Sequence, residues 1–329
     1  MNEWLRENLV CPRDKQKLQT KENNLVCPEN HIYPVVDDIP VMLLEEAEHI
    51  HGYITQTLEN VAKMQASGKF IDEFNPSEHN SNSVDPFVQA EIPYTCGNLY
   101  IPLLQKLTRY PLPEFRMPQS SGERLLDVGC NWGRWSITAA QKGYRPIGID
   151  PSLNAVLAAR RISKQLNAAT DFVVGDARHL PFASDCFEVG FSYSVFQHFS
   201  KENAKISLNE VARTVKKGGK ILMQMPNKLG IRSFHQQVRR GFSEGEGFDV
   251  RYWMPAELMD FFRQTFGETK MTADCYFGLG IQKNDVDLLP TRFKIVVHSS
   301  EFLRRMSDNL PLLVKVADSV YLESVNQKN

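Results

Sequence analysis

The chain has 329 residues, a formal net charge of −1 and six cysteines. This length supports a sizeable core and more than one domain, and the near-neutral charge gives no general attraction to nucleic acid, so that only a local basic patch would bind it. The scattered cysteines, the absence of a long apolar run and the acidic start Met1–Glu7 predict a cytoplasmic protein with reduced thiols, no signal peptide and no membrane partner.

Residues 9–44 contain two short segments in which a cysteine stands directly before a proline. Asp14 follows Cys11 by three positions, and His31 follows Cys27 by four. Zinc knuckles space their ligands this closely because tetrahedral coordination then closes without strain. The candidate metal ligands are therefore Cys11, Asp14, Cys27 and His31.

This segment, with its tail from Tyr33 to Leu44, resembles two kinds of zinc ribbon. One stands at the front of some rRNA guanine methyltransferases, and the other is the small activator subunit of tRNA and protein methyltransferases. Asp14 stands where that pattern has a cysteine, and a carboxylate is uncommon in a structural zinc site. The alternatives are a ribbon that binds structural zinc and one without metal that packs on the main domain. The apolar residues available for that packing are Tyr33, Val35, Ile39, Val41 and Leu43.

Residues 46–118 are expected to form a helical linker or lid segment, separate from a ribbon domain at 1–45. Ile50, Ile54, Leu58, Val61 and Met64 recur at helical spacing and predict a helix with one packed face. Residues 75–86 are polar and flanked by prolines, which is typical of a loop. This loop is either an idle linker or a lid, and the interpretation as a linker is preferred.

The stretch Leu125–Gly133 predicts a buried strand that enters a tight turn and then a helix from Arg134 to Lys142, with Gly143 after its end. The next apolar strand ends on Asp150. Together they form the start of a β-α-β unit, whose ligand lies at the strand ends. Asn131 stands where the nucleotide-binding turn G-x-G-x-x-G has its middle glycine. Asparagine tolerates left-handed dihedrals, so it preserves the turn. A tight turn without ligand is the alternative.

From this point the sequence resembles the class I S-adenosylmethionine-dependent methyltransferases. Their acid-x-Gly-x-Gly-x-Gly loop is matched at Asp127, Gly129 and Gly133 and departed from at Asn131. Three later segments follow in the family's order, namely 171–177, 180–194 and 211–226, so the resemblance covers roughly Gly122 to Asn227. It implies S-adenosylmethionine as cofactor. The cofactor-binding residues that it implies are Asp127, Gly129, Cys130, Asn131, Gly133, Asp150, Pro151, Asp176, Ala177, Ser192 and Tyr94.

The predicted fold class is α/β. A Rossmann-like, seven-stranded methyltransferase sheet with helices on both faces occupies 119–329, next to the small ribbon-like β domain and a helical cap. Strand six is expected at Thr269–Phe277 and strand seven at Asp318–Glu323. Insertions at 228–250 and 285–315 are expected to form the substrate cap. The arginines of the first insertion suit either a solvated helix face or an anion clamp.

Methyl transfer needs mainly alignment of a nucleophile, and a weakly acidic nucleophile needs a base as well. His198, just after strand four, is the candidate base, although a histidine at this place need not act as one. Candidate substrate residues are Tyr193, Gln197, His235 and Arg232. The preferred function is methylation of O, N or C of a small-molecule metabolite. The alternatives are an RNA base methyltransferase and a cofactor-binding module without turnover. The oligomeric state is left open.

Overall fold

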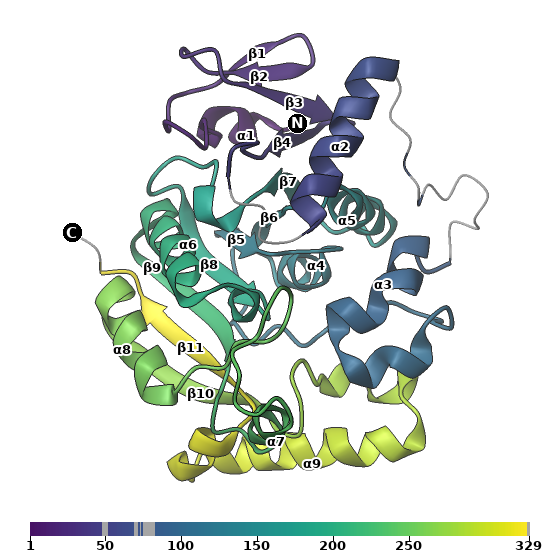
Figure 1. The fold of residues 1–329 in the computed structure, drawn as a ribbon, viewed down its shortest axis with the longest axis vertical. Helices are drawn as coiled ribbons and strands as arrows, with labels where there is room; N and C mark the ends of the chain where they lie inside the picture. The colour runs from purple at the N-terminus through teal and green to yellow at the C-terminus, as the bar shows by residue number, and fades with distance from the viewer. Residues whose placement is uncertain (48–51, 69–71, 73, 75–82, 328–329) are drawn as a thin grey trace.

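The computed structural model describes residues 1–47, 52–68, 72, 74 and 83–327 (Figure 1). Its strands are β1 Gln19–Lys21, β2 Asn24–Val26, β3 Ile32–Val36, β4 Ile39–Met42, β5 Arg124–Val128, β6 Arg145–Asp150, β7 Asp171–Gly175, β8 Phe187–Tyr193, β9 Val215–Pro226, β10 Thr269–Cys275 and β11 Ser319–Val325. These strands form one mixed sheet in the order β1-β2-β3-β4-β7-β6-β5-β8-β9-β11-β10.

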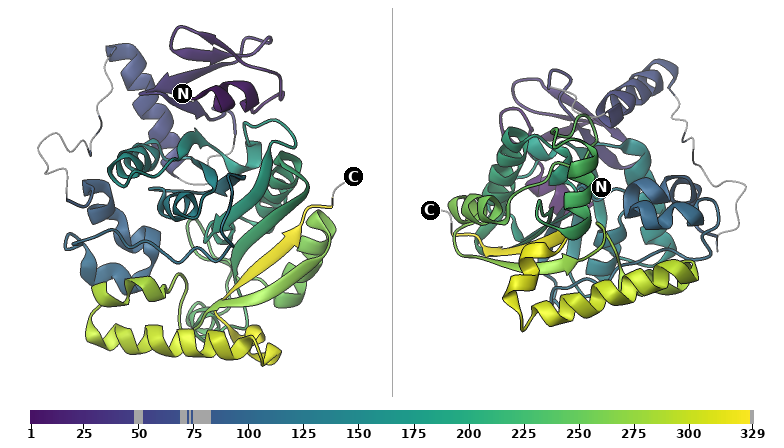
Figure 2. Two further views of the ribbon diagram at one scale, coloured as in Figure 1. Left: turned by 180° about the vertical axis from the view of Figure 1, so that it is seen from behind. Right: turned by 60° about the horizontal axis from the view of Figure 1, so that its bottom comes forward.

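Helices lie between the strands and cover the sheet (Figures 1 and 2). The α-helices are α1 Glu3–Asn8, α2 Gly52–Ser67, α3 Pro86–Cys96, α4 Arg134–Gln141, α5 Leu153–Gln165, α6 Lys201–Thr214, α7 Ile231–Arg239, α8 Pro255–Phe266 and α9 Thr291–Ser307. The 3₁₀-helices are η1 Asn98–Leu103, η2 Ala177–His179, η3 Phe196–His198, η4 Lys283–Leu288 and η5 Pro311–Val316.

The strand order reverses at β5. Strands β6 and β7 lie on one side of it and β8 and β9 on the other, and all five run parallel. Strand β11 lies antiparallel between β9 and β10. At such a reversal the connections leave the sheet in opposite directions, so a crevice opens beyond the carboxyl ends of the central strands. The topology therefore places a ligand site at the ends of β5 and β6.

Alternate residues of the central strands enter different hydrophobic clusters, as their period of two requires. Leu125 packs in a cluster that contains Trp135 and Ala139 of α4. Leu126 packs in another cluster, with Leu208 of α6. Both faces of the sheet are therefore covered by helices, which confirms the predicted α/β class.

The sheet is larger than predicted. The sequence predicted a seven-stranded sheet in 119–329 beside a separate ribbon domain, whereas the described residues of both form one sheet of eleven strands, to which 119–329 contributes β5 to β11. Strand β4 pairs in parallel with β7, with Val41 opposite Val174 and Met42 opposite Gly175. In addition, the Val10 N–H donates to the Pro181 carbonyl at 2.9 Å. Strands from both sides of the domain boundary expected at residue 45 therefore belong to one sheet.

The residues expected to pack the ribbon on the main domain do so. Tyr33, Ile39, Val41 and Leu43 are buried, and Val35 is partly buried. Tyr33 belongs to the same core cluster as Leu126 of β5, while Ile39 and Val41 join a cluster with Val156 of α5. The ribbon has no separate core and depends on the main domain, as expected for such a short unit.

The helix predicted in residues 45–70 is α2. Ile54 and Val61 are buried, while Leu58 and Met64 are partly buried against the same cluster. Ile50 lies outside the described residues, as do positions 75–82 of the expected loop. The interpretation of residues 75–86 as a linker or a lid therefore stays a prediction.

The element boundaries in the main domain lie close to the predicted ones. Helix α4 ends at Gln141, one residue earlier than expected, and Gly143 follows it with φ of +84°. Strands β10 and β11 occupy the segments predicted for strands six and seven. Helix α9 lies within the expected insertion at 285–315, and η5 begins near its end, at Pro311.

The continuous core predicts that damage to the ribbon destabilises the main domain. We expect Ile39→Ala to lower the free energy of unfolding by about 2–5 kcal/mol, because the Ile39 side chain is 2% exposed and its removal leaves a cavity. Denaturant unfolding followed by fluorescence measures this value. The matched control is Ile32→Ala, whose side chain in β3 is 61% exposed and should change stability little. Equal stability of the two variants would contradict the shared core.

Candidate functional site

A cavity of about 730 Å³ lies beyond the carboxyl ends of the parallel strands. Its wall includes Gly129 and Asn131 after β5, Asp150 at the end of β6, Asp176 after β7 and Ser194 after β8. These ends meet at one edge because the strands are parallel and neighbouring. The cavity therefore occupies the position that the strand order assigns to a ligand.

The turn after β5 depends on left-handed backbone conformations. Gly129, Asn131 and Gly133 have φ of +74°, +47° and +78°, so Asn131 adopts the conformation expected of it. An added Cβ at Gly129 would overlap Val195, and one at Gly133 would lie 3.1 Å from Ala159 Cβ. Their missing side chains therefore allow other side chains to pack closely against the turn. Gly129 also lines the cavity, whereas Gly133 is not part of its wall.

The Asp150 carboxylate joins the ends of β5 and β6. Its Oδ2 accepts from the Asn131 N–H at 3.0 Å, and its Oδ1 accepts from the Ser152 N–H at 2.9 Å. Burial raises the pKa of Asp150 to about 6. A carboxylate oxygen has two lone pairs, so each oxygen can still accept a hydrogen bond from a ligand in the cavity.

The structure places most of the predicted site residues on the cavity wall. From the cofactor set these are Gly129, Asn131, Asp150, Pro151, Asp176, Ala177 and Tyr94, and from the substrate and catalytic set they are Tyr193, Gln197, His198 and Arg232. The remaining predicted residues, Asp127, Cys130, Gly133, Ser192 and His235, are not part of this wall. His235 is exposed on α7, so its position does not support a substrate role.

Asp127 and Ser192 support the wall from behind. Asp127 Oδ2 accepts from Ser136 Oγ at 2.6 Å, and burial raises the pKa of Asp127 to about 7. Ser192 Oγ donates to the Val128 carbonyl at 2.9 Å. Both side chains are buried, so we assign them to holding the β5 turn rather than to direct contact with a ligand.

Asp176 forms a buried ion pair with Arg178, which the sequence did not indicate. Arg178 Nη2 lies 2.6 Å from Asp176 Oδ2, and Arg178 Nε donates to the same carboxylate at 3.0 Å. The resemblance implied that Asp176 lies beside the adenine. In the structure its charge is compensated by the guanidinium, and Arg178 itself also lines the cavity.

His198 is held by contacts on both ring nitrogens. Nδ1 lies 2.8 Å from the Phe248 carbonyl oxygen and can only donate to it, so in the neutral ring Nε2 is the basic nitrogen. Gln197 Nε2 lies 3.2 Å from that nitrogen. The Phe248 ring stacks on the imidazole with centroids 3.8 Å apart. This arrangement positions a base on the cavity wall.

Gln197 and Tyr193 differ in what they offer to a substrate. Gln197 Oε1 is buried and makes no hydrogen bond within the described residues, so it can accept one from a bound molecule. The Tyr193 hydroxyl donates to Asp274 Oδ2 at 2.8 Å and accepts from Gln282 Nε2 at 3.0 Å. Only its ring is therefore available to shape the cavity.

Sequence reasoning missed the residues that close the cavity from distant segments. Tyr53 at the start of α2 contacts the Phe248 ring edge-on, with centroids 6.2 Å apart, and both line the cavity. Gly278–Ile281 line it from the chain after β10. These contacts join segments about 195 positions apart, and no local pattern marks them. The 285–315 insertion, expected in the cap, contributes no residue to the described wall.

That insertion instead braces the β5 turn. Arg134 at the start of α4 forms a buried ion pair with Asp285 of η4, with Nη2 2.6 Å from Oδ2. The Tyr100 hydroxyl donates to the same carboxylate oxygen. Because a buried charge is stable only when paired, this contact ties the C-terminal helices to the helix that follows the turn.

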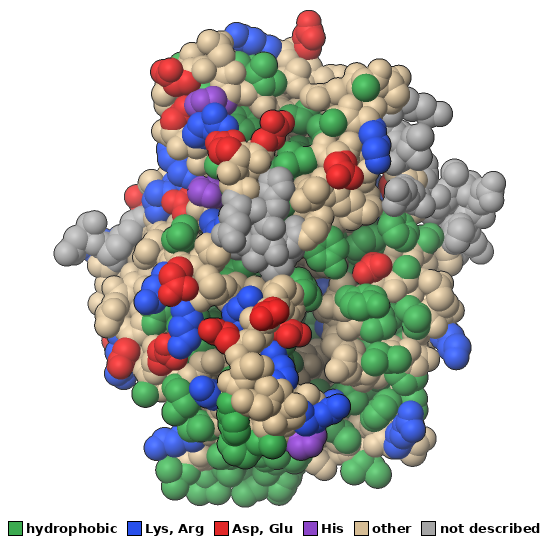
Figure 3. All heavy atoms as spheres, in the orientation of Figure 1, with side chains coloured by type: hydrophobic (Ala, Val, Ile, Leu, Met, Phe, Trp, Pro, Cys, Tyr) green, Lys and Arg blue, Asp and Glu red, His purple; other side chains and the backbone are tan. Residues whose placement is uncertain are grey.

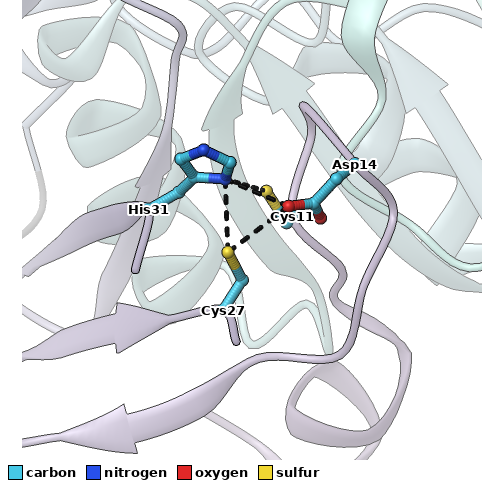
Figure 4. A group of neighbouring side chains, drawn as sticks. All are labelled: Cys11, Asp14, Cys27 and His31. Atoms are coloured by element: carbon cyan, nitrogen blue, oxygen red, sulfur yellow. Dashed lines mark hydrogen bonds and ion pairs between the residues drawn. The ribbon is translucent and has the colours of Figure 1, made fainter. Parts of the chain in front are cut away.

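A second candidate site lies in the ribbon, where Cys11, Asp14, Cys27 and His31 converge (Figure 4). Their ligand atoms all lie within 4.8 Å of one another. His31 Nδ1 is 3.2 Å from Cys27 Sγ, 3.5 Å from Cys11 Sγ and 3.1 Å from Asp14 Oδ2. Ligands of a tetrahedral zinc ion, with bonds of about 2.0–2.3 Å, are separated by roughly 3.3–3.8 Å. The four residues predicted from spacing therefore meet in a group of suitable size.

Comparison with known proteins identifies the central domain. The family model described as "Methyltransferase domain" matches residues 125–219, so the chain contains a domain of this kind. A Schizosaccharomyces pombe tRNA (carboxymethyluridine(34)-5-O)-methyltransferase is 31% identical over 127 residues, 38% of this chain and 49% of that protein. A ubiquinone biosynthesis O-methyltransferase of Azorhizobium caulinodans is 26% identical over 143 residues, 42% of this chain and 55% of that protein.

These matches span about half the length of either relative. Among solved structures, one chain comes from the complex between the Haloferax volcanii Trm112 methyltransferase activator and a methyltransferase. Its TM-score is 0.46 at 20% identity, and the match covers 65% of this chain and 86% of that chain. Within the described residues, no helix is both long and apolar enough to cross a membrane.

Proposed function

We propose that this chain is an S-adenosylmethionine-dependent methyltransferase that methylates an oxygen, nitrogen or carbon atom of a small-molecule metabolite. The observation that carries the proposal is that Asp150, the Asn131 turn and His198 all line one cavity at the strand-order reversal of a methyltransferase domain. The cavity volume of about 730 Å³ falls in the range of small-molecule sites.

The residues of the wall suit the adenosyl cofactor. Asp150 has lone pairs free to accept hydrogen bonds from two vicinal ribose hydroxyls, and Tyr94 is a large, exposed ring on the wall next to the turn. We assign cofactor contact to Gly129, Asn131, Asp150, Pro151, Asp176, Ala177 and Tyr94. When bound, S-adenosylmethionine supplies a methyl group already activated by the sulfonium.

The chain then has to orient the acceptor and remove its proton. Gln197 Oε1 accepts a hydrogen bond from the acceptor, since it has no other described partner. The acceptor displaces the Gln197 amide N–H from His198 Nε2, and this nitrogen then takes the proton, while the hydrogen bond from Nδ1–H to Phe248 keeps the ring in the required tautomer and orientation. Tyr53 and Phe248 meet at the wall and reduce access of water.

The ribbon is proposed to hold one structural zinc ion through Cys11, Asp14, Cys27 and His31. The close approach of the four ligand atoms supports this proposal, as does the thiolate, imidazole and carboxylate chemistry that zinc accepts. Zinc would supply a cross-link between the two knuckles. With zinc bound, the ribbon would depend less on its few apolar contacts to keep β4 beside β7.

The second candidate function is methylation of an RNA base. It is favoured by the Schizosaccharomyces pombe relative, whose name specifies a modified tRNA uridine. An RNA strand would need a positive surface that extends beyond the cavity, and the net charge of the whole chain is −1. Total tRNA as an acceptor in the transfer assay described below separates the two functions.

The cofactor assignment predicts a pH-dependent affinity. We expect Asp150→Asn to weaken binding of S-adenosylhomocysteine by roughly 1.5–3 kcal/mol, because a charge-assisted hydrogen bond is lost. Since burial raises the pKa of Asp150 to about 6, the unmodified protein should lose affinity as the pH falls through about 6, when the carboxylate gains a proton. The variant should show a flat profile. Titration calorimetry between about pH 5 and 8 measures both.

The same experiment has a control in Asp287→Asn, an exposed aspartate of η4 that is not part of the cavity wall. It should bind S-adenosylhomocysteine like the unmodified protein at every pH. An unchanged affinity in Asp150→Asn would contradict the cofactor site.

Methyl transfer itself can be tested with S-adenosylmethionine labelled in its methyl group. We expect label to enter the small-molecule fraction of a cell extract and not added tRNA. His198→Ala should lower the transfer rate about 10²–10⁴-fold at neutral pH, as expected for loss of a general base, without weakening S-adenosylhomocysteine binding. His298→Ala, on the exposed face of α9, is the control. Binding without any labelled product would favour the non-catalytic alternative.

The zinc proposal predicts about one zinc ion per chain by elemental analysis. Cys27→Ser should release the metal and lower the midpoint of thermal unfolding, because the ligand set is broken. Cys186→Ser, a buried cysteine outside the cluster, should retain zinc. Protein purified without chelator that contained no zinc would exclude the metal site.

A further inference from the structure

Helix α7 turns its arginines toward the cavity. Arg232, Gln236 and Arg239 line the wall together with Arg240, which directly follows the helix. Their spacing of four, seven and eight residues places them along one side of a helix. A solvated helix face, one of the two alternatives that the sequence allowed, would instead point these charges away from the cavity.

The apolar residues of the same helix point outward. Phe234 and Val238 are about half exposed, at 52% and 50%, whereas the polar Ser233 and Gln237 are buried. An ordinary surface helix has the opposite arrangement. Figure 3 shows hydrophobic side chains along the lower edge of the molecule, the edge where Figure 1 places α7 and α9. Helix α7 is therefore oriented with its arginines, and not its apolar residues, toward the cavity.

These arginines are only partly compensated by protein groups. Arg240 Nη1 lies 3.4 Å from Asp249 Oδ2, and Arg232 donates to the Phe277 carbonyl at 3.3 Å. The Arg239 guanidinium makes no hydrogen bond or ion pair with the described residues, and this side chain is exposed. The guanidinium groups therefore keep donors that a ligand can use.

Two carboxylates line the cavity near these arginines, and one of them already accepts hydrogen bonds from the backbone. Asp318 is buried, and its two oxygens accept from the Ser233 and Phe277 N–H groups, both at 2.6 Å. Asp249 is 59% exposed, and among the described residues its ion pair is with Arg240. Three arginines against these two carboxylates leave an excess of positive charge on this part of the wall.

The arginine end is connected to the proposed transfer site through the segment after α7. The Arg251 N–H donates to the Gln197 carbonyl at 2.8 Å, and Arg251 Nη1 donates to the His198 carbonyl at 2.9 Å. Arg240 Nη2 donates to the neighbouring Val250 carbonyl at 2.9 Å. One molecule in the cavity can therefore contact both the arginines and the Gln197–His198 pair.

We propose that the methyl acceptor is a small acid whose carboxylate or phosphate group is bound by Arg232, Arg239 and Arg240. This inference rests on the proposed methyltransferase function. The planar guanidinium matches both anions with paired N–H donors, which makes arginine better suited to this task than a point charge. A neutral acceptor would leave cations facing it without a partner, at a cost in desolvation.

The charge of the acceptor can be tested before its identity is known. A small-molecule extract is separated on an anion-exchange resin, and each fraction is incubated with the protein and methyl-labelled S-adenosylmethionine. We expect label in the retained, acidic fraction. Prior treatment of that fraction with alkaline phosphatase should abolish acceptance of label for a phosphate and leave it intact for a carboxylate. Label in the neutral or basic fraction, or in added tRNA, would overturn the proposal.

The role of the arginines is tested with the acidic fraction as acceptor. The double variant Arg232→Gln/Arg239→Gln changes two exposed side chains and should raise the KM for the acceptor about 10- to 100-fold through loss of charge-assisted bonds. Arg240→Gln should act in the same direction. Arg263→Gln, an exposed arginine of α8 outside the cavity, is the control.

Calorimetry with S-adenosylhomocysteine tests the methyltransferase function separately from the acidic acceptor. Its affinity should be the same in all four proteins, because none of the substituted arginines belongs to the residues assigned to cofactor contact. An unchanged KM in the double variant would overturn the acidic acceptor alone. Failure of the unmodified protein to bind S-adenosylhomocysteine would overturn the methyltransferase function, and the acceptor proposal with it.

Discussion

The site depends on how a single carboxylate joins two neighbouring strand ends. Asp150 accepts from backbone N–H groups on both sides, from Asn131 after β5 and from Ser152 after β6. These bonds hold the left-handed turn against the end of the next strand. The glycines allow the turn because they adopt its positive φ, and they leave room for Val195 and Ala159 to pack against it. The rigid edge of the cavity thus results from backbone conformation and packing.

The ribbon and the main domain share one sheet, which makes the N-terminal segment part of the structural support of the site. Strand β4 covers the edge of β7, the strand that leads into Asp176 on the cavity wall. An uncovered edge strand would leave unpaired backbone groups and a surface prone to pairing with other chains. Covering it stabilises β7 at the position where the chain turns into the cavity.

The other end of the cavity is built by segments that follow the parallel strands. Helix α7 contributes charge, the segment at 248–251 connects it to Gln197 and His198, and η4 braces α4 through the Arg134–Asp285 pair. The result is a cavity whose wall carries both the Asp150 carboxylate and the arginines of the α7 segment. A cationic methyl donor near Asp150 and an acidic acceptor near the arginines would each lie beside charges of opposite sign.

The sequence by itself determined the α/β class, the positions of the main strands along the chain, the β5 turn and the four ribbon residues that converge, because each depends on local spacing, apolar periodicity or turn chemistry. Only the tertiary structure decided which residues face the cavity. It moved Asp127 and Ser192 behind the wall, paired Asp176 with Arg178 and added Tyr53 from α2. It also joined the ribbon to the sheet. These outcomes depend on contacts between residues far apart in the chain, and no pattern within a short segment records which surface a side chain will meet after folding.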